Sequence, residues 1–135
     1  MKRRWVDANV ILRFITKDPP EMAARAARLM AKAEKGEVVL YIAPLVVAEI
    51  IWVLKSFYHY TMTDIAQVMS ALISAAGIEV DDRALLFRAV EQSRDRNVDF
   101  VDAYLALQAA AQGEPVCTFD ETDFKRLPVE WMTPK

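Results

Sequence analysis

Short apolar runs alternate with helical segments from one end of the chain to the other. The runs cover residues 38–42, 78–80, 116–119 and 129–132, and a short first segment, residues 3–6, begins with two arginines and ends in Trp5 and Val6. Between them, apolar residues recur at the spacing of a helix. Parallel strands need a crossover connection, which is usually a helix, so this alternation predicts a parallel sheet. We expect an α/β fold, with the chain forming a single three-layer α/β/α domain whose mainly parallel central sheet has helices on both faces.

Proline and glycine mark the expected ends of the helices. Proline is tolerated in the first turn of a helix, whereas glycine commonly follows the last turn. The expected helices cover residues 21–35, 44–58, 63–76, 82–96 and 99–113, and a short helical turn covers 120–125. We expect Asp18, Thr63 and Asp99 to act as N-caps, because their side chains can accept hydrogen bonds from unpaired amides of the first turn.

Composition leaves carboxylates as the main source of chemistry. The chain holds one Cys and one His, which excludes an internal disulfide, a multi-cysteine zinc site and a mechanism based on paired histidines. Its 17 basic and 19 acidic residues give a formal charge of −2, so it lacks the general basicity of a protein that coats nucleic acid. Any polyanion must therefore be bound by a local group of basic residues.

No segment has the features of a signal peptide or a membrane span. The basic start is followed by an apolar run that Asp7 and Arg13 interrupt. The most hydrophobic stretch, residues 38–54, contains Pro44 and Glu49 and is shorter than the roughly 20 apolar residues that span a bilayer. We therefore expect a cytoplasmic protein that does not bind a membrane.

Two acids occupy positions where a carboxylate can face a cleft. Asp7 directly follows the first apolar run, and ligands of parallel sheets bind at the carboxyl ends of strands. An Asp there also commonly bonds its own backbone in a turn, so both interpretations stay open, and Asn9 could orient Asp7 or a water. Glu49 has apolar neighbours at helical spacing. A carboxylate on such an apolar stripe of a helix either faces a cleft, pairs with a cation from elsewhere in the fold or stays protonated.

Two further pairs of acids stand three residues apart at expected helix starts. Asp99 and Asp102 begin one helix, and Asp120 and Asp123 begin the short helical turn. Capping and a favourable interaction with the helix dipole explain each pair without any chemistry. Asp120 nevertheless follows an apolar run as Asp7 does, so these two acids can converge if their strands are neighbours.

Four short motifs, taken in order, resemble those of a known family. They are Trp5-Val6-Asp7-Ala8-Asn9-Val10-Ile11, Ala48-Glu49-Ile50, Asp99-Phe100-Val101-Asp102-Ala103-Tyr104-Leu105-Ala106 and Thr118-Phe119-Asp120-Glu121-Thr122-Asp123-Phe124. Together they are similar to the acidic motifs of PIN-domain nucleases. In size and pattern the chain most resembles the VapC-type ribonuclease toxins of toxin–antitoxin pairs, and the resemblance covers essentially the whole chain.

The resemblance assigns roles to individual residues. The implied catalytic residues are Asp7, Glu49, Asp102 and Asp120, and the auxiliary residues are Asn9, Asp99, Thr118 and Asp123. Phe119 stands where the family often has an Arg, so the substrate contacts at this point are not necessarily the usual ones.

Converging carboxylates repel one another unless a cation lies between them. Oxygen ligands without His or Cys favour Mg²⁺, with Mn²⁺ as an alternative, over Zn²⁺. We expect Asp7 and Asp102 to bind the metal directly, with Glu49 and Asp120 acting through water or orienting the nucleophile. The resemblance narrows the substrate to RNA and implies a cognate antitoxin protein and a homodimer.

Basic residues flank the acidic motifs, as binding of a polyanion above an acidic site requires. The candidate RNA-binding residues are Arg13, Lys17, Arg94, Arg96, Lys125 and Arg126. We expect them to form a rim around the acids.

Two other functions stay open from the sequence. Asp7 followed two residues later by Asn9 is similar to the start of haloacid-dehalogenase-type phosphatases, in which the first Asp is the nucleophile. That alternative needs a second Asp where Asn9 stands and gives Glu49 no role. The other alternative is a catalytically inactive PIN-like module that binds RNA or protein, which predicts eroded acids, whereas all four positions are filled.

Overall fold

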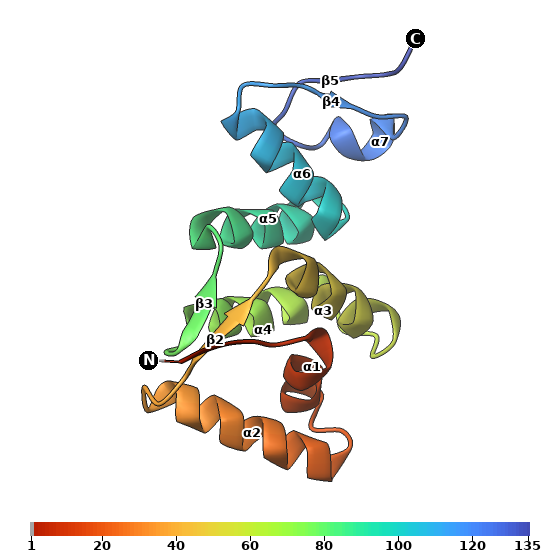
Figure 1. Cartoon of the computed structure of the whole chain (residues 1–135). Coiled ribbons are helices and arrows are strands. Elements are labelled where there is room, and N and C mark those ends of the chain that lie inside the picture. Colours follow the sequence, from red (N-terminus) through yellow and green to blue (C-terminus); the bar gives the residue numbers. More distant parts are fainter. Residues whose placement is uncertain (1) are drawn as a thin grey trace. The chain divides into compact units, whose positions relative to one another are not determined.

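The structure, a computed structural model, describes residues 2–135 and divides into two compact units. Unit 1 is Met1–Asp81 and unit 2 is Asp82–Lys135. The helices and strands of each unit, labelled in Figure 1, are described separately below.

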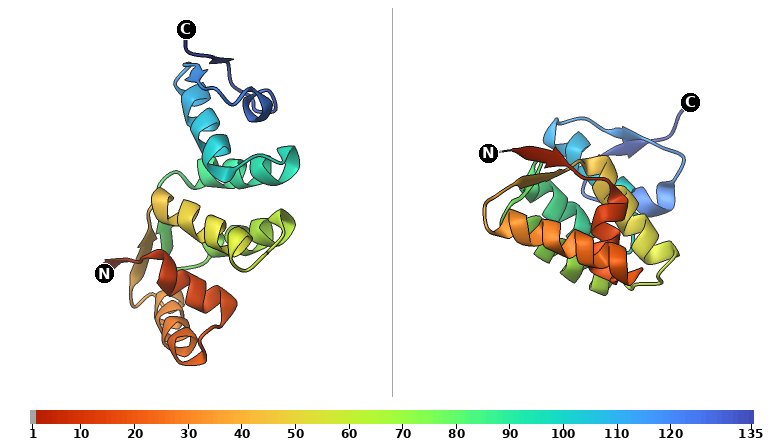
Figure 2. Two further views of the ribbon diagram at one scale, coloured as in Figure 1. Left: turned by 90° about the vertical axis from the view of Figure 1, so that its right-hand side faces the viewer. Right: turned by 60° about the horizontal axis from the view of Figure 1, so that its bottom comes forward.

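Unit 1 contains a parallel sheet of three strands in the order β1-β2-β3. Its strands are β1 Arg3–Trp5, β2 Val39–Ile42 and β3 Ile78–Val80, and its helices are α1 Ala8–Thr16, α2 Pro20–Glu34, α3 Pro44–Ser56 and α4 Met62–Ser74. Figure 2 (left) shows these four helices on one side of the strands. This is expected when both crossover connections are right-handed and the strand order advances in one direction.

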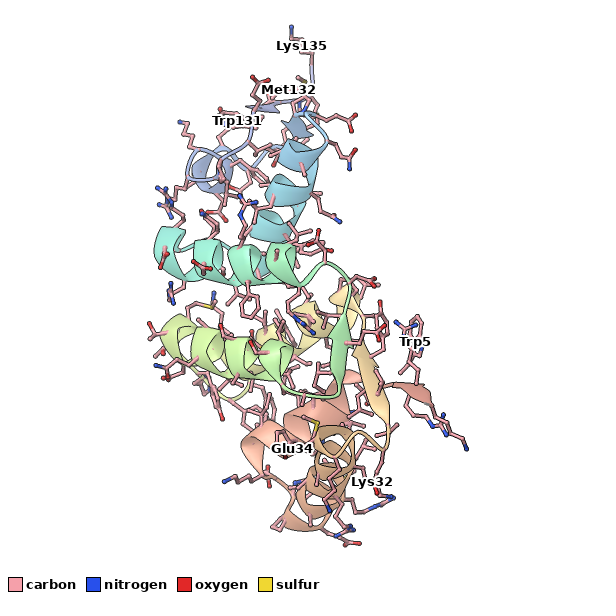
Figure 3. All side chains as sticks on the ribbon, turned by 90° about the vertical axis from the view of Figure 1, so that its left-hand side faces the viewer. Trp5, Lys32, Glu34, Trp131, Met132 and Lys135 are labelled. Carbon is pink, nitrogen blue, oxygen red and sulfur yellow. The ribbon has the colours of Figure 1, made fainter. Side chains whose placement is uncertain are left out.

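The two faces of this sheet differ in chemistry because side chains alternate along a strand. Leu40 and Ile42 of β2 are fully buried beneath the helices, where Ile50 of α3 and Met69 of α4 are also fully buried. On the other face Tyr41 packs against Trp5 in a tilted arrangement, with ring centroids 4.4 Å apart and an interplanar angle of 56°. Trp5 itself stays 69% exposed at the β1 edge (Figure 3).

Unit 2 begins with a pair of packed helices and ends with a small parallel sheet. Its elements are α5 Arg83–Arg96, α6 Phe100–Ala111, β4 Val116–Cys117, α7 Glu121–Phe124 and β5 Trp131–Met132. Leu86 and Val90 of α5 and Ala103 and Leu107 of α6 are buried. Ser93, also buried, donates from its Oγ to the carbonyl oxygen of Val98 at 2.6 Å and so fixes the turn between the helices.

The α/β class with parallel strands is confirmed, with hydrogen-bonded pairing of β1, β2 and β3 in unit 1 and of β4 and β5 in unit 2. The expected runs and helices appear close to their predicted positions. The apolar run after Asp7, for which the sequence predicts no defined element, forms α1. That residues 1–135 form a single domain stays a prediction.

The predicted N-caps are corrected at three helices. Thr61, not Thr63, caps α4, because its hydroxyl accepts from the backbone N–H of Asp64 at 3.1 Å and Thr63 already lies inside the first turn. Pro19 occupies the N-cap position of α2, which displaces Asp18 from it. Asp99 stands at the N-cap of α6, but its side chain makes no capping hydrogen bond.

Within residues 2–135, none of the helices combines the length and the hydrophobicity needed to cross a bilayer.

Candidate active site

Three carboxylates of unit 2 converge. Asp102, Asp120 and Asp123 each offer an oxygen atom, and these oxygens all lie within 4.8 Å of one another. Asp102 and Asp123 are half-buried, whereas Asp120 is exposed. We refer to these three residues as the acidic cluster.

The first turn of α6 positions Asp102. Phe100 and Ala103, its near neighbours on the helix, are buried in unit 2 and fix the rotation of the helix about its axis. Because Asp102 lies in the first turn, it is near the positive end of the helix dipole, and this favours its ionised form.

A short hydrogen-bonded turn positions the other two acids. The backbone N–H of Asp120 donates to Thr118 Oγ1 at 2.8 Å, and Asp120 Oδ1 accepts from the backbone N–H of Asp123 at 3.1 Å. Phe124, which is buried, anchors α7 to the rest of unit 2. Thr118 thus shapes the turn that carries Asp120, and Asp123, predicted as an auxiliary residue, joins the cluster.

Burial and mutual repulsion oppose the ionisation of Asp102. Desolvation is the largest cause, and the charges of Asp99, Asp123 and Asp120 add to it, so that the pKa of Asp102 rises from 3.8 to about 6. Asp99 therefore acts on Asp102 through its charge without belonging to the cluster. Because a nearby cation favours the ionised form, it would reverse this shift.

The cluster fits a hard divalent cation. It offers oxygen ligands only, which suit Mg²⁺ or Mn²⁺ better than Zn²⁺. Two oxygens bound to one Mg²⁺ at about 2.1 Å each can be no more than about 4.2 Å apart. The oxygens of the cluster, within 4.8 Å of one another, reach that limit with small side-chain movements.

The remaining predicted acids belong to unit 1. Asp7 caps α1, and its Oδ1 accepts from the backbone N–H of Val10 at 3.2 Å. Asp7 thus bonds the backbone that follows it, as one of the two interpretations expects, and its second oxygen leaves a role as ligand compatible with the cap. Asn9 is exposed in the first turn of the same helix.

Glu49 is exposed on α3, so it does not lie in the buried apolar setting that its neighbours along the helix suggest. Its helical neighbours Leu45 and Trp52 are themselves 85% and 66% exposed. The buried side of α3 carries Val47 and Ile50 instead. An apolar neighbourhood on one helix did not reveal which face of that helix the fold covers.

The four predicted catalytic acids are therefore divided between the units. Asp7 and Glu49 lie in unit 1, and Asp102 and Asp120 lie in unit 2, where the structure brings them together with Asp123. Convergence of all four acids stays a prediction.

Several of the predicted RNA-binding residues form hydrogen bonds or ion pairs within the protein. Arg13 donates from Nη1 to the carbonyl oxygen of Asp18 at 3.2 Å, and Arg94 forms an ion pair of 2.8 Å with Asp95. Arg126 donates to the carbonyl oxygen of Asn97 at 3.3 Å. The other three candidates, Lys17, Arg96 and Lys125, are exposed. Their contact with RNA stays a prediction.

Sequence reasoning missed a hollow beside Asp7. It measures about 490 Å³, lies between α1 and α2, and is lined by Arg25 among other residues. Arg25 falls in a basic stripe of α2 that looks like an ordinary solvated face. Such a stripe could also join a rim of RNA-binding residues, and its position beside the hollow is what separates Arg25 from an ordinary surface residue.

Comparison with known proteins assigns the chain to a family. The sequence matches the PIN domain over residues 5–130. No curated protein matches it. Among solved structures the chain is similar to VapBC2 from Rickettsia felis bound to a DNA fragment from their promoter, with 18% identity, 100% of both chains covered and a TM-score of 0.37, values too low to add to the assignment. Because the family match spans nearly the whole sequence, it argues against the phosphatase alternative, and the chain belongs to the PIN-domain family, whose members are generally metal-dependent nucleases.

Proposed function

We propose that this chain is a metal-dependent endoribonuclease and the toxin of a type II toxin–antitoxin pair. It hydrolyses phosphodiester bonds of RNA with Mg²⁺, or alternatively Mn²⁺, held by carboxylates. The observation that carries the proposal is the acidic cluster of Asp102, Asp120 and Asp123 in a chain of the PIN-domain family. Three acids this close are costly to ionise together unless a cation joins them.

The chain's own residues would divide the work as follows. Asp102 and Asp7 would hold the cation directly, and Asp120 and Glu49 would complete the site through water or orient the nucleophile. Thr118 keeps Asp120 in place through the backbone hydrogen bond of 2.8 Å. A divalent cation bound there supplies positive charge that lowers the pKa of a coordinated water and stabilises negative charge on the phosphate.

The partners are proposed on the four ordered motifs alone. These motifs resemble those of VapC-type toxins, which implies a cognate antitoxin, a homodimer and a cytoplasmic site of action. The product of a reading frame next to this one is the natural candidate for the antitoxin, and co-expression tests it.

A metal-dependent cleavage assay tests the enzymatic part. With single-stranded RNA as substrate, the protein should cleave with Mg²⁺ and not with EDTA. Asp102→Asn should lower the rate by roughly 100-fold or more, because the substitution removes a charged ligand while keeping a side chain of the same shape.

Glu121→Gln is the matched control, because Glu121 is an exposed acid of α7 outside the acidic cluster. It should cleave like the wild type. Cleavage in EDTA, or full activity of Asp102→Asn, would contradict the proposal. RNA binding without cleavage in Mg²⁺ would favour the inactive binding module instead.

A further inference from the structure

Two adjoining hollows in unit 1 form one groove. The first measures about 490 Å³ and the second about 450 Å³, and both are lined by Asp7, Val10 and Leu29. Because they share these residues, the hollows meet at Asp7. Val10 and Leu29 are apolar and Asp7 is acidic, so a carboxylate and an apolar surface lie together where the hollows adjoin.

Cationic side chains line the first hollow. Arg25 projects from α2 and is exposed to solvent. Arg13 lines the same hollow from α1, where its Nη1 is held by the carbonyl oxygen of Asp18 and its Nε is buried without a hydrogen-bond partner in residues 2–135. The anchored Arg13 and the exposed Arg25 give this end positive charge.

The second hollow combines a cation with an aromatic ring. Its lining includes Arg4 and Trp5, both exposed. Trp5 packs one side against Tyr41, at a centroid distance of 4.4 Å, and stays 69% exposed (Figure 3). The guanidinium carbon of Arg3 also lies over the Trp5 ring, 5.7 Å from its centroid, so two neighbours hold the ring while most of the residue faces solvent.

We propose that this groove binds a single-stranded segment of RNA that runs past Asp7, with one phosphate on Arg25, another on Arg4 and a base stacked on Trp5. The inference rests on the proposed function and specifies the form of its substrate. Exposed aromatic rings beside a cationic track are what single strands recognise, because stacking needs a base that is not paired. The arginines match the charge of a polyanion, which Asp7 alone would repel.

The groove also sets the position of the scissile bond. A strand held at both ends of the groove crosses Asp7, so the phosphate between the two contacts is the one presented to the carboxylate. Trp5 and Arg25 would position the RNA strand, because they hold a base and a neighbouring phosphate and do not touch the reacting atoms.

Binding measured without turnover tests the groove separately from catalysis. The probe is a fluorescent single-stranded RNA of about 12 nucleotides, titrated in EDTA over a series of salt concentrations. Trp5→Ala should weaken binding by about fivefold or more, because it removes one base–aromatic stack. Trp5→Phe keeps a ring and should retain most of the affinity.

Arg25→Ala should act differently. It should weaken binding and reduce the slope of log affinity against log salt by about 0.7, because one phosphate contact is lost. Trp5→Ala should leave that slope unchanged. The matched controls are Arg28→Ala, an exposed arginine of the same helix, and Trp52→Ala, an exposed tryptophan of α3, since neither residue lines the groove.

Several results would contradict the proposal that the groove binds single-stranded RNA. One is that Arg25→Ala and Arg28→Ala lower the affinity for the RNA probe equally, and another is that Trp5→Ala binds the probe as tightly as the wild type. The proposal also fails if a duplex of the same RNA binds as tightly as the single strand, or if the wild type does not bind the probe. Affinity for RNA that is unchanged in both groove variants, with loss of binding to a co-expressed antitoxin, would reassign the groove to a protein partner. If the groove variants behave as expected but no RNA is cleaved in Mg²⁺, the proposed function fails while the groove stands.

Discussion

Asp102 is an acid whose surroundings oppose its ionisation. It is half-buried at the start of α6, next to two other carboxylates, and its pKa is raised to about 6. The structure therefore holds an acid where ionisation is unfavourable without a cation. Such a position costs stability and is typical of residues retained for function.

This opposition to ionisation predicts how stability depends on pH. In an acid whose pKa is higher in the folded state, the folded protein binds more protons than the unfolded chain between the two pKa values, here 3.8 and about 6. Stability from this group is complete below pH 3.8 and is lost as the pH rises through about 6. In EDTA at pH 8, Asp102→Asn should therefore be more stable than the wild type by about 1 to 2 kcal/mol, after allowance for solvent screening.

Chemical denaturation at pH 4 and pH 8 measures this difference, which should shrink as the pH falls. Glu121→Gln, the exposed neighbour, should show no comparable pH-dependent gain. A variant Asp102→Asn that is less stable than the wild type at pH 8 in EDTA would contradict the raised pKa.

Sequence motifs identified acids better than they identified environments. Asp102, Asp120 and Thr118 could be singled out because they stand in the ordered motifs that resemble those of the family. Local hydrogen bonds then define the turn that carries Thr118 and Asp120. The exposure of Glu49 could not be predicted, because it depends on which face of α3 the rest of unit 1 covers. The groove residue Trp5 was missed because its setting depends on Tyr41, which is distant in sequence.

At the scale of elements, one glycine determines how closely β3 approaches α2. Gly77 has a φ of +80°, and a Cβ placed there would collide with the backbone carbonyl of Ala33 at the end of α2. Gly36 has nearly the same φ, +81°, but open space around it. The two glycines share a conformation and differ in the room around them.

We expect Gly77→Ala to lower the free energy of unfolding by about 3 kcal/mol or more, because a backbone clash adds to the strain of a positive φ. Gly36→Ala should cost about 1 kcal/mol, the strain alone. Urea denaturation of both variants measures the difference, and equal losses would show that the close approach to Ala33 does not matter.

Element types followed from the sequence more reliably than element ends. The β-branched runs and the Pro and Gly signals locate β2, β3 and α2 closely. Caps were harder, because Thr61 and Thr63 both suit an N-cap and only the path of the chain before α4 distinguishes them. The run after Asp7 became α1, whose apolar face packs against α2 and α3.

At the scale of the whole molecule, the alternation of strands and helices predicted the parallel pairing in both sheets, since each connection contains a helix. It could not predict that β4 and β5 would form a sheet inside unit 2. The motif order predicts that acids of both units act together, and this is the central claim of the proposed function.

A double-mutant cycle in the cleavage of single-stranded RNA with Mg²⁺ tests that claim most directly. The variants are Asp7→Asn of unit 1, which can keep the capping hydrogen bond from Val10, Asp102→Asn of unit 2, and the two combined. Asp64→Asn, an exposed acid in the first turn of α4, is the control and should cleave normally.

Each single variant should lose roughly 100-fold or more in cleavage rate. The double variant should cleave as fast as the less active of the two single variants, because both substitutions disable the same metal site. Wild-type activity in Asp7→Asn, or losses that multiply in the double variant, would contradict the account.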